Sequence, residues 1–376
     1  MASNLGVMEH TSPLETRMRI VQYYPRAVAG DGGMTGAVQR LSLSMQRAGA
    51  DAVIAYDEGS GQSQPVDGLT WRSVRHRGPK HQRLPDGKAL AEALRDADLV
   101  VMNSGFTPHN VAAARIARRH GIAYVVAPRG AYDPHIFLRR RQLKKLWWRY
   151  FEGPMVRRAR AVHLFFDDEK AELERLGYTG ATLVAPNGVE PPPGMQWDGG
   201  TGGYLLWLGR FDPQHKGIDL LVRALAIVPR DSRPRLRLVG PDWRDGRERM
   251  VALVRELDLA EWVSIEPPLY GDEKWAALRS ATGFVYPSRW EGFGNSVAEA
   301  ASLGLPLLVT PYPFGRLLHR RGGAVLATAT VEGLAEGLQA VTGAATLGAR
   351  AQQIVLDEMS WDAVGRSWMT QAEALL

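Results

Sequence analysis

The chain contains no cysteine among its 376 residues. This absence excludes disulfide bonds, thiolate metal ligands and a cysteine nucleophile, and it suits a reducing compartment without requiring one. No uninterrupted apolar run approaches the roughly 18 residues of a membrane-spanning helix. Residues 1–17 carry two acidic residues and lack the apolar stretch of a secretory signal, so we expect a flexible tail there. These absences predict a cytoplasmic protein.

The composition is that of a globular protein with more than one domain. Hydrophobic residues make up 45% of the chain and charged residues 23%. A chain of this length exceeds what one hydrophobic core usually supports, so we expect two domains. The formal charge of +6 favours anionic ligands. Phosphorylated small molecules, acidic lipid headgroups and nucleic acid would all satisfy that charge.

From Met18 onward, short apolar runs rich in β-formers alternate with longer amphipathic segments. This rhythm predicts a parallel, doubly wound sheet. Residues 189–203 are rich in proline and glycine and should form a linker, after which a second alternating series begins. The sequence therefore predicts an α/β fold with two Rossmann-like domains, 18–188 and 204–357. The ligand is expected in a cleft that faces the carboxyl ends of both sets of strands.

The most informative segment surrounds Glu291, which follows a predicted strand. Gly292 and Gly294 let the loop after that strand turn tightly. A helix is then expected, with Asn295 or Ser296 as its cap. This arrangement aims the start of a helix into the predicted cleft.

The start of that helix can hold a diphosphate, because its partial positive charge is joined by N–H groups expected to be free at Ser296 and Val297. Glu299 lies one turn inside the helix. Two interpretations of Glu299 stay open: it completes a capping box with Ser296, or it accepts hydrogen bonds from sugar hydroxyls as Glu291 would. Two carboxylates that bracket a glycine-rich turn favour the second.

Two basic residues follow the first predicted strand of the second domain. Arg210 stands at the end of that strand, and Lys216 comes six residues later. Arginine and lysine on a loop are usually only solvated. Here both occupy the ligand-binding edge of a doubly wound sheet, and a departing diphosphate needs cationic partners.

A glycine pair, Gly32 and Gly33, separates the first predicted strand from the first predicted helix. Glycine at this point would let the main chain approach a phosphate or a sugar closely. Taken alone the pair is a weak signal, because turns use glycine throughout proteins.

Together these segments resemble the retaining glycosyltransferases of family four, which have the GT-B fold. The resemblance covers nearly the whole chain from Met18. It is most specific at residues 291–306, which look like the family's two-glutamate motif, and at residues 209–217, which look like its Gly-Arg…Lys-Gly element. It implies that residues 358–376, with Trp361, form a helix that crosses back to the first domain.

The resemblance also implies an activity. A hexose would pass from a UDP- or GDP-sugar to a hydroxyl of a glycan, a glycolipid or a secondary metabolite, with retention of anomeric configuration. The reaction would need no cofactor and no metal ion. No protein nucleophile is required, because the leaving phosphate helps to deprotonate the acceptor. The expected partners are a nucleotide-sugar donor and an unidentified acceptor, and no nucleic acid.

Roles for individual residues follow from the same resemblance. Arg210 and Lys216 would neutralise the donor diphosphate, and with Glu291 they form the predicted catalytic set. Glu291 would bind hydroxyls of the hexose, and Glu299 would bind the nucleotide ribose. The backbone of Phe293 and of the three residues after it would hold sugar and phosphate.

Two positions depart from the family pattern. Arg129 stands where many members have a histidine that contacts the donor sugar or the reaction centre, although a subset has arginine there. Leu317 and Leu318 occupy the place where the family usually has an acidic residue after a glycine-rich turn. The resemblance therefore carries no acidic donor contact from that loop.

Two groups of residues could suggest a bound metal ion. Asp96 and Asp98 spell the Asp-x-Asp of metal-dependent transferases, but they precede a strand and lie on the edge opposite a nucleotide site. His163, His215 and His319 lack the spacing of metal ligands.

Three other classes of protein are alternatives to a glycosyltransferase. An epimerase or hydrolase on the same fold, acting on the donor alone, and a non-catalytic sugar- or lipid-binding protein remain alternatives. A dinucleotide-dependent oxidoreductase is disfavoured, because no Gly-x-Gly-x-x-Gly follows the first strand.

Residues 136–158 are expected to form one long basic helix that docks on an anionic membrane face or on a phosphorylated lipid. Four apolar residues recur at helical spacing and should pack inward: Leu143, Leu146, Trp147 and Tyr150. Four residues are expected on the outer face: Arg141, Lys145, Trp148 and Arg149. An ordinary solvated face is the alternative.

Overall fold

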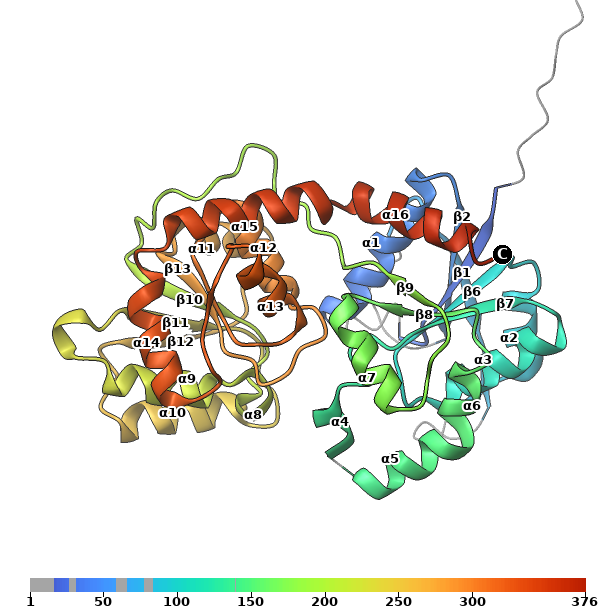
Figure 1. Ribbon diagram of the computed structural model, residues 1–376, viewed down its shortest axis with the longest axis horizontal. Coiled ribbons are helices and arrows are strands. Elements are labelled where there is room, and N and C mark those ends of the chain that lie inside the picture. The colour runs from blue at the N-terminus through green and yellow to red at the C-terminus, as the bar shows by residue number, and fades with distance from the viewer. Residues whose placement is uncertain (1–16, 27–31, 59–65, 78–83, 139) are drawn as a thin grey trace, which may run out of the picture.

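The computed structural model describes residues 17–26, 32–58, 66–77, 84–138 and 140–376. Two parallel sheets occupy the two halves of an elongated molecule, each with helices packed around it (Figure 1). This arrangement confirms the predicted fold of two doubly wound α/β halves. The predicted tail lies almost entirely outside the described residues, as do five residues of the loop before Gly32.

The first sheet has seven parallel strands in the order β3-β2-β1-β6-β7-β8-β9. Their bounds are β1 (Arg19–Tyr23), β2 (Asp51–Asp57), β3 (Thr70–Val74), β6 (Leu99–Asn103), β7 (Ala123–Ala127), β8 (Ala161–Leu164) and β9 (Thr182–Val184). The central strand β6 is buried along its whole length, as expected for a parallel strand covered on both faces. The edge strand β3 was not predicted, because only Val74 of its five residues is buried and the apolar signal is weak. A short hairpin pairs β4 (His76–Arg77) with β5 (Leu84–Pro85).

Helices connect these strands. They are α1 (Gly33–Arg47), α2 (Gly87–Leu94), α3 (Pro108–Arg119), α4 (Pro134–Leu138), α5 (Arg141–Trp147), α6 (Gly153–Val156) and α7 (Lys170–Arg175), with a π-helical turn at Trp148–Glu152 and a 3-10 turn at Asp167–Glu169. Helix α3 shows how the sequence sets its start: the Thr107 hydroxyl accepts a hydrogen bond from the His109 N–H, and Pro108 occupies the first position.

The second sheet has six parallel strands in the order β12-β11-β10-β13-β14-β15. Their bounds are β10 (Tyr204–Leu208), β11 (Arg235–Val239), β12 (Val263–Glu266), β13 (Gly283–Tyr286), β14 (Leu307–Val309) and β15 (Val325–Leu326). The helices of this half are α8 (Pro213–Lys216), α9 (Ile218–Ile227), α10 (Gly246–Glu256), α11 (Gly271–Ser280), α12 (Asn295–Leu303), α13 (Pro313–Arg320), α14 (Val331–Val341) and α15 (Ala345–Glu358), with a 3-10 turn at Arg230–Ser232. Among the described residues no helix is both long and apolar enough to cross a bilayer.

The last helix, α16 (Trp361–Glu373), leaves the second half and packs on the first (Figure 1). It lies against α1, where a side chain at Gly365 would place its Cβ only 2.5 Å from the Ser44 carbonyl oxygen. The Gln371 side chain bonds both the N–H and the carbonyl of Val184 in β9, each at 2.9 Å. The chain end therefore ties the two halves together.

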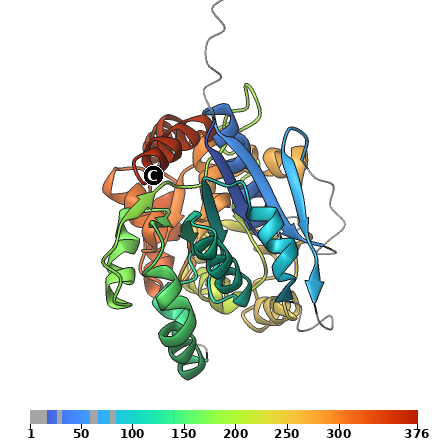
Figure 2. The ribbon, with the colours of Figure 1, turned by 90° about the vertical axis from the view of Figure 1, so that its right-hand side faces the viewer.

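The single helix predicted over residues 136–158 is wrong. Helix α4 ends at Leu138, Arg140 adopts a left-handed φ of 56°, and α5 then runs into the π-helical turn. Residues with positive φ interrupt an α-helix, so α4 is separate from the rest of the segment. From Arg141 to Val156 the chain stays helical, through α5, the π-helical turn and α6. Figures 1 and 2 both show α5 at the outer end of its half, projecting away from the sheet.

The predicted inward packing of the apolar stripe is also wrong. Leu143, Leu146 and Tyr150 are 59%, 55% and 59% exposed, because α5 has no partner element beneath this face in the described chain. Trp148, which we expected on the outer face, is half-buried and donates its Nε1–H to the Leu176 carbonyl at 3.0 Å. Trp147 is half-buried as well and bonds Glu152 at 2.9 Å.

Candidate functional site

The loops that carry the predicted site residues follow strands that flank the point at which the strand order of each sheet reverses. In the first sheet this point lies between β1 and β6, and Gly32 and Gly33 follow β1. In the second sheet it lies between β10 and β13, where Arg210 follows β10 and Glu291 follows β13. Open α/β sheets bind ligands in the crevice at such points. The topology thus places these residues at the ligand-binding edges of the two sheets.

Glu291 lies in a buried polar cluster at this edge. Its carboxylate accepts hydrogen bonds from Lys216 Nζ and, at 2.9 Å, from the Tyr286 hydroxyl, to which Lys216 Nζ also donates at 2.9 Å. The side chains of Glu291 and Lys216 are only 14% and 11% exposed. Burial alone would raise the pKa of Glu291, but the Lys216 ammonium lowers that pKa to about 2. Glu291 is therefore ionised at neutral pH.

Trp290, next to Glu291, is stacked between histidines from both halves. Its ring lies 4.6 Å from the His215 ring and 5.4 Å from the His135 ring, with interplanar angles of 9° and 8°. Burial, followed by the nearby Lys216 charge, lowers the pKa of His215 to about 4. His215 is therefore neutral at physiological pH, and its stacking needs no charge.

Helix α12 begins two residues earlier than a Ser296 cap would require. Gly294 is its N-cap in the left-handed region with φ 88°, and no side chain caps the helix. The Val297 N–H, which we expected to be free, donates to the Gly294 carbonyl at 2.9 Å, so this part of the prediction is wrong. The Ser296 hydroxyl donates to the Leu208 carbonyl at 3.1 Å. Asn295 and Ser296 remain as the first N–H groups of the helix.

Glu299 does not complete a capping box. Its carboxylate accepts a hydrogen bond from Lys274 Nζ at 2.7 Å, and its side chain is 20% exposed. Glu299 also lines a cavity of about 190 Å³ between the two halves. Residues from both halves surround it, among them Gly33, Arg40, Gly188, Trp275, Asn295 and Trp361. A carboxylate in an inter-domain cavity can accept hydrogen bonds from a diol.

The backbones of the two halves come into contact beside this cavity. A Cβ at Gly130 would lie 2.8 Å from the Gly292 Cα, so only glycine permits this approach. Asn187 Nδ2 donates to Asn295 Oδ1 at 2.9 Å, and Asn295 Nδ2 donates to the Gly33 carbonyl at 3.3 Å. The predicted donor-binding residues Gly33, Gly292 and Asn295 are thus brought together.

The Phe293 side chain is buried in an aromatic cluster. Its ring centroid lies 5.7 Å from that of Phe166 and 5.0 Å from that of Phe314, and the Phe166 and Phe314 centroids are 5.4 Å apart. Phe293 is 4% exposed. Phe166 belongs to the first half and Phe314 to the second, so the stack joins the two halves. Only the backbone of Phe293 can contribute to a donor site.

Arg129 is held in a strained turn at the end of β7. It has a left-handed φ of 54°, uncommon for a residue with a side chain, and Gly130 follows with φ 80°. Its guanidinium donates to Asn103 Oδ1 from Nε at 3.0 Å and from Nη2 at 2.9 Å. Burial lowers the pKa of Arg129 to about 10, so the group stays charged at neutral pH. Arg129 therefore places a fixed positive charge at the carboxyl end of β7.

Arg210 lies over the Trp243 ring, with its guanidinium carbon 4.3 Å from the ring centroid. Its side chain is 41% exposed, and Asp212 is 4.0 Å away. Its Nε is buried without a hydrogen-bond partner among the described residues. A buried N–H without a partner is costly, so this atom favours an anion beside it.

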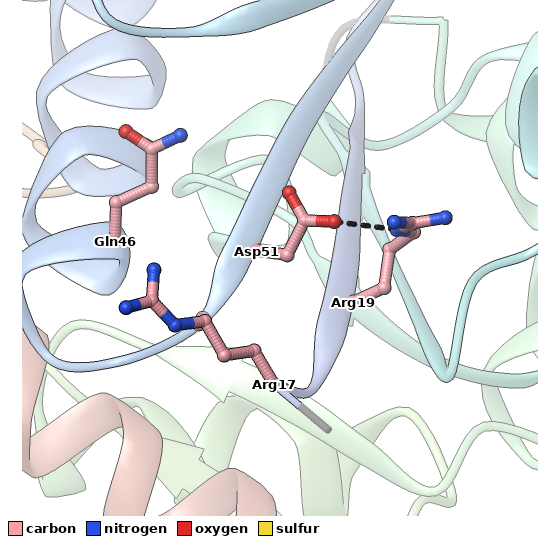
Figure 3. Close-up of a pocket in the computed structure, with 5 residues that line it drawn as sticks. Arg17, Arg19, Gln46 and Asp51 are labelled. Carbon is pink, nitrogen blue, oxygen red and sulfur yellow. Dashed lines mark hydrogen bonds and ion pairs between the residues drawn. The ribbon is translucent and has the colours of Figure 1, made fainter. Parts of the chain in front are cut away.

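A larger cavity, of about 430 Å³, lies at the opposite end of β1 and β2 (Figure 3). Arg19 and Asp51, the first residues of these strands, line it and neutralise each other at 2.6 Å. Ligands of open α/β sheets bind at the carboxyl ends of strands, so this cavity is not the candidate site.

The Asp-x-Asp pattern is occupied by other groups. Asp96 forms ion pairs with Arg19 and Arg72, each at 2.5 Å, and Asp98 accepts a hydrogen bond from the Arg19 N–H at 2.7 Å. Both carboxylates therefore stabilise the first sheet, through Arg19 of β1 and Arg72 of β3. This structural role accounts for the pattern.

Several residues that complete the site were missed in the sequence. Tyr286 and Lys274 bind the two predicted glutamates, and Trp290 stacks across the two halves. A tyrosine at the end of an apolar strand could have been noted, because it precedes Glu291 by five residues. The roles of Lys274 and Trp290 depend on contacts between elements that no local pattern reveals.

Two protein families match the chain, one in each half. Residues 202–343 match the family described as glycosyl transferases group 1, and residues 32–188 match the family described as glycosyl transferase 4-like domain. The second match ends directly before the predicted linker, and the first begins at its end. Together they span most of the chain.

Some curated proteins match most of the chain, and others match a shorter part of it. The GDP-mannose:cellobiosyl-diphosphopolyprenol alpha-mannosyltransferase of Xanthomonas oryzae pv. oryzae is 26% identical over 344 residues, which cover 86% of this chain and 87% of the relative. The D-inositol 3-phosphate glycosyltransferase of Frankia alni is 36% identical over 115 residues, which cover 28% of each.

Solved structures share the fold over almost the whole chain. Sucrose-phosphate synthase from Thermosynechococcus elongatus matches with a TM-score of 0.76 at 20% identity, covering 96% of this chain and 99% of that chain. Anabaena HepE, in complex with UDP and glucose, matches with a TM-score of 0.74 at 16% identity, covering 96% and 100%. At these identities the likeness concerns the fold.

Proposed function

The chain belongs to the family four glycosyltransferases, and from that premise we propose that it transfers a hexose, with retention of configuration, from a UDP- or GDP-sugar to a hydroxyl of a lipid-linked glycan. The donor would lie in the cleft between the two halves. The acceptor would approach from the first half.

The buried Lys216–Glu291 pair carries this proposal. A nucleotide sugar presents a diphosphate next to a polyol, and the cleft offers an ammonium next to a carboxylate. Arg210, whose Nε has no hydrogen-bond partner in the part of the chain that the structure describes, adds a second cation for the diphosphate. Glu299 in the inter-domain cavity suits the ribose diol. The complementarity thus covers the hexose, the diphosphate and the ribose of the donor.

The proposed reaction needs no group that the chain lacks. The acceptor oxygen forms a bond to the anomeric carbon on the face from which the diphosphate leaves. The bond from that carbon to the phosphate oxygen breaks, and its electron pair stays on the leaving diphosphate. The acceptor proton passes to a leaving phosphate oxygen. Arg210 and Lys216 would stabilise the charge that grows on the diphosphate in the transition state.

The lipid-linked acceptor is supported by the surface of α5 and the π-helical turn. Four exposed apolar residues lie on these two elements: Leu143, Leu146, Tyr150 and Phe151. Leu138, at the end of α4, is exposed as well. Arg141, Lys145 and Arg149 are exposed among them. Apolar side chains beside basic ones suit the boundary between acyl chains and anionic headgroups. The name of the Xanthomonas relative includes a cellobiosyl-diphosphopolyprenol, which is a lipid that carries a glycan on an anionic diphosphate.

The first experiment is a donor screen. Thermal unfolding is followed with UDP, GDP, ADP and their sugars, and a ligand of the cleft raises the Tm by binding only the folded state. The stabilising donor is then incubated with and without membrane lipids that carry diphosphate-linked glycans. Transfer to lipid supports the proposal. Donor consumption without lipid would instead favour an epimerase or a hydrolase.

A further inference from the structure

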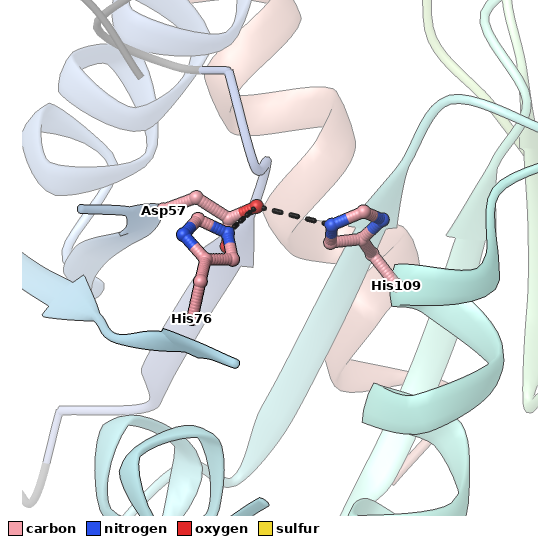
Figure 4. A group of neighbouring side chains, drawn as sticks. All are labelled: Asp57, His76 and His109. Atoms are coloured by element: carbon pink, nitrogen blue, oxygen red, sulfur yellow. Dashed lines mark ion pairs between the residues drawn. The ribbon is translucent and has the colours of Figure 1, made fainter. Parts of the chain in front are cut away.

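Two histidines and an aspartate form a cluster in the first half that the donor chemistry does not use (Figure 4). Asp57 is the last residue of β2, His76 is the first residue of β4, and His109 lies in the first turn of α3. One ligand atom from each lies within 4.8 Å of the other two. Figure 4 shows the three side chains converging from separate elements.

The distances suit a single small ion. Asp57 Oδ2 is 2.7 Å from His76 Nε2 and 3.3 Å from His109 Nε2. Tetrahedral zinc with bonds of about 2.0–2.1 Å places its ligand atoms roughly 3.3 Å apart. The distance between Asp57 and His109 matches that spacing, and the distance between Asp57 and His76 would have to lengthen by about 0.6 Å for both atoms to bind one ion.

In two of the three residues, His109 and Asp57, the atom that would face away from an ion has a partner of its own. His109 Nδ1 is 3.1 Å from the Thr107 hydroxyl, and Asp57 Oδ1 is 3.3 Å from the Tyr23 hydroxyl. Metal-binding histidines commonly engage their second nitrogen in this way, which fixes the ring orientation. Thr107 is itself positioned as the N-cap of α3.

Burial makes a cation favourable here. Asp57 is 4% exposed, and the side chains of His76 and His109 are 10% and 19% exposed. A buried carboxylate is costly unless a cation lies beside it.

We propose that Asp57, His76 and His109 bind one Zn²⁺ ion, with a fourth position left to water or to an oxygen of a ligand. Two imidazoles and one carboxylate suit zinc, whereas Mg²⁺ prefers oxygen ligands. The ion would fasten the β4–β5 hairpin to β2 and to α3. We expected no metal site from the sequence, in which His76 and His109 stand on separate segments and show no metal-ligand spacing. Zinc binding here does not depend on the proposed transfer reaction.

The test is equilibrium dialysis of untagged, metal-depleted full-length protein against Zn²⁺, with metal content measured directly. We expect one tight Zn²⁺ per chain. His76→Gln and His109→Gln should each weaken binding at least about 100-fold, and Thr107→Val about 10-fold to 100-fold, with Thr107→Ser restoring it. His120→Gln, at the exposed end of α3, is the matched control and should bind as wild type does.

Co²⁺ provides a readout that needs no variant. Substitution into the site should give the intense visible absorption of a tetrahedral complex, which Zn²⁺ removes by competition. Circular dichroism checks that each variant is folded. Wild-type protein that binds no stoichiometric Zn²⁺, or folded His76→Gln and His109→Gln variants that bind it normally, would overturn the proposal. In that case the cluster is only a hydrogen-bonded His-Asp-His group.

Discussion

Lys216 donates a hydrogen bond to the Glu291 carboxylate, although 75 residues separate the two in the chain. Gly217 makes this contact possible. It ends α8 in the left-handed region with φ 65°, and a Cβ there would lie 1.9 Å from the Pro287 carbonyl oxygen. Only glycine lets the end of α8 lie against the loop that carries Glu291. The Lys-Gly pair in the sequence is therefore a packing requirement as well as a source of charge.

Replacing Gly217 by alanine should destabilise the protein and disrupt the Lys216–Glu291 pair. The left-handed conformation alone costs a residue with a side chain about 1–2 kcal/mol. The clash with a backbone oxygen adds to that cost. Gly322→Ala is the matched control, because Gly322 has φ 72° with open space around its Cβ position. Equal losses in urea unfolding free energy for both variants would contradict the packing argument.

Arg210→Ala should lower turnover by about 100-fold to 1000-fold, as the loss of one transition-state donor does in other enzymes. Donor affinity should change far less, because charge on the diphosphate grows as the glycosidic bond breaks. Steady-state kinetics with the donor found in the screen separates kcat from KM.

Arg244→Ala serves as the control for this variant. Arg244 lies over the same Trp243 ring at 5.3 Å, but it follows β11 and is exposed. We expect near-normal turnover. An Arg210→Ala enzyme as active as Arg244→Ala would remove Arg210 from the catalytic set.

The two glutamates should separate in binding experiments. Glu291→Gln should impair transfer and leave the affinity for free nucleoside diphosphate nearly unchanged, since Glu291 is predicted to bind the hexose. Glu299→Gln should weaken the free nucleotide itself, because Glu299 lines the inter-domain cavity. Isothermal titration calorimetry measures both. Wild-type nucleotide affinity in Glu299→Gln would leave Glu299 only its contact with Lys274.

Glu169 should make stability fall as pH rises. Burial raises the pKa of this carboxyl to about 8, while the N–H groups of Phe165 and Phe166 oppose the shift. A folded-state pKa above the unfolded value means that the folded chain keeps a proton that the unfolded chain loses. The stabilisation is therefore full below about pH 4.5 and is lost as pH rises toward 8, by at most about 1.4 kcal/mol per unit.

Glu169→Gln keeps the acceptor oxygen and removes the titration. The difference in unfolding free energy between wild type and this variant should shift against wild type from pH 5 to pH 8. Neighbouring carboxyls cancel in the difference. A difference that stays constant across this range would show that Glu169 is ionised in the folded state.

The α5 surface should bind anionic vesicles. Reversal of three charges, Arg141, Lys145 and Arg149 to glutamate, should abolish flotation with such vesicles at low salt, since each basic residue near the surface contributes about 1 kcal/mol. Leu143→Ser with Leu146→Ser should weaken binding at unchanged charge. The matched control reverses Arg115, Arg118 and Arg119, which are exposed on α3. Wild-type protein that floats with neither anionic nor neutral vesicles would contradict membrane docking.

The fold followed from local patterns because buried parallel strands are continuous apolar runs, as in β6. The edge strand β3 escaped prediction because four of its five residues keep some exposure. The start of α12 was misplaced because a left-handed glycine, Gly294, replaces the usual side-chain cap. Local periodicity placed the stripe around Leu143 inward, since an apolar stripe usually meets a partner element.

The residues of the site also fall into two groups, those that a local sequence pattern predicts and those that it does not. The predicted residues near Glu291 were found because a glycine-rich turn after a strand has a recognisable spacing. The ion pair of Glu299 with Lys274, and the convergence of Asp57 with His76 and His109, arise only when distant elements pack. No spacing within one segment encodes such contacts.

The most direct test of the account is the stereochemistry of the product. Purified enzyme is given an α-linked nucleotide sugar and a lipid-linked glycan acceptor, and the anomeric proton of the transferred hexose is observed by NMR as it forms. The account predicts a new α-glycosidic signal that appears only when acceptor is present and that forms about 100-fold to 1000-fold more slowly in Arg210→Ala. A β-linked product, or a changed donor in the absence of acceptor, would contradict a retaining transferase.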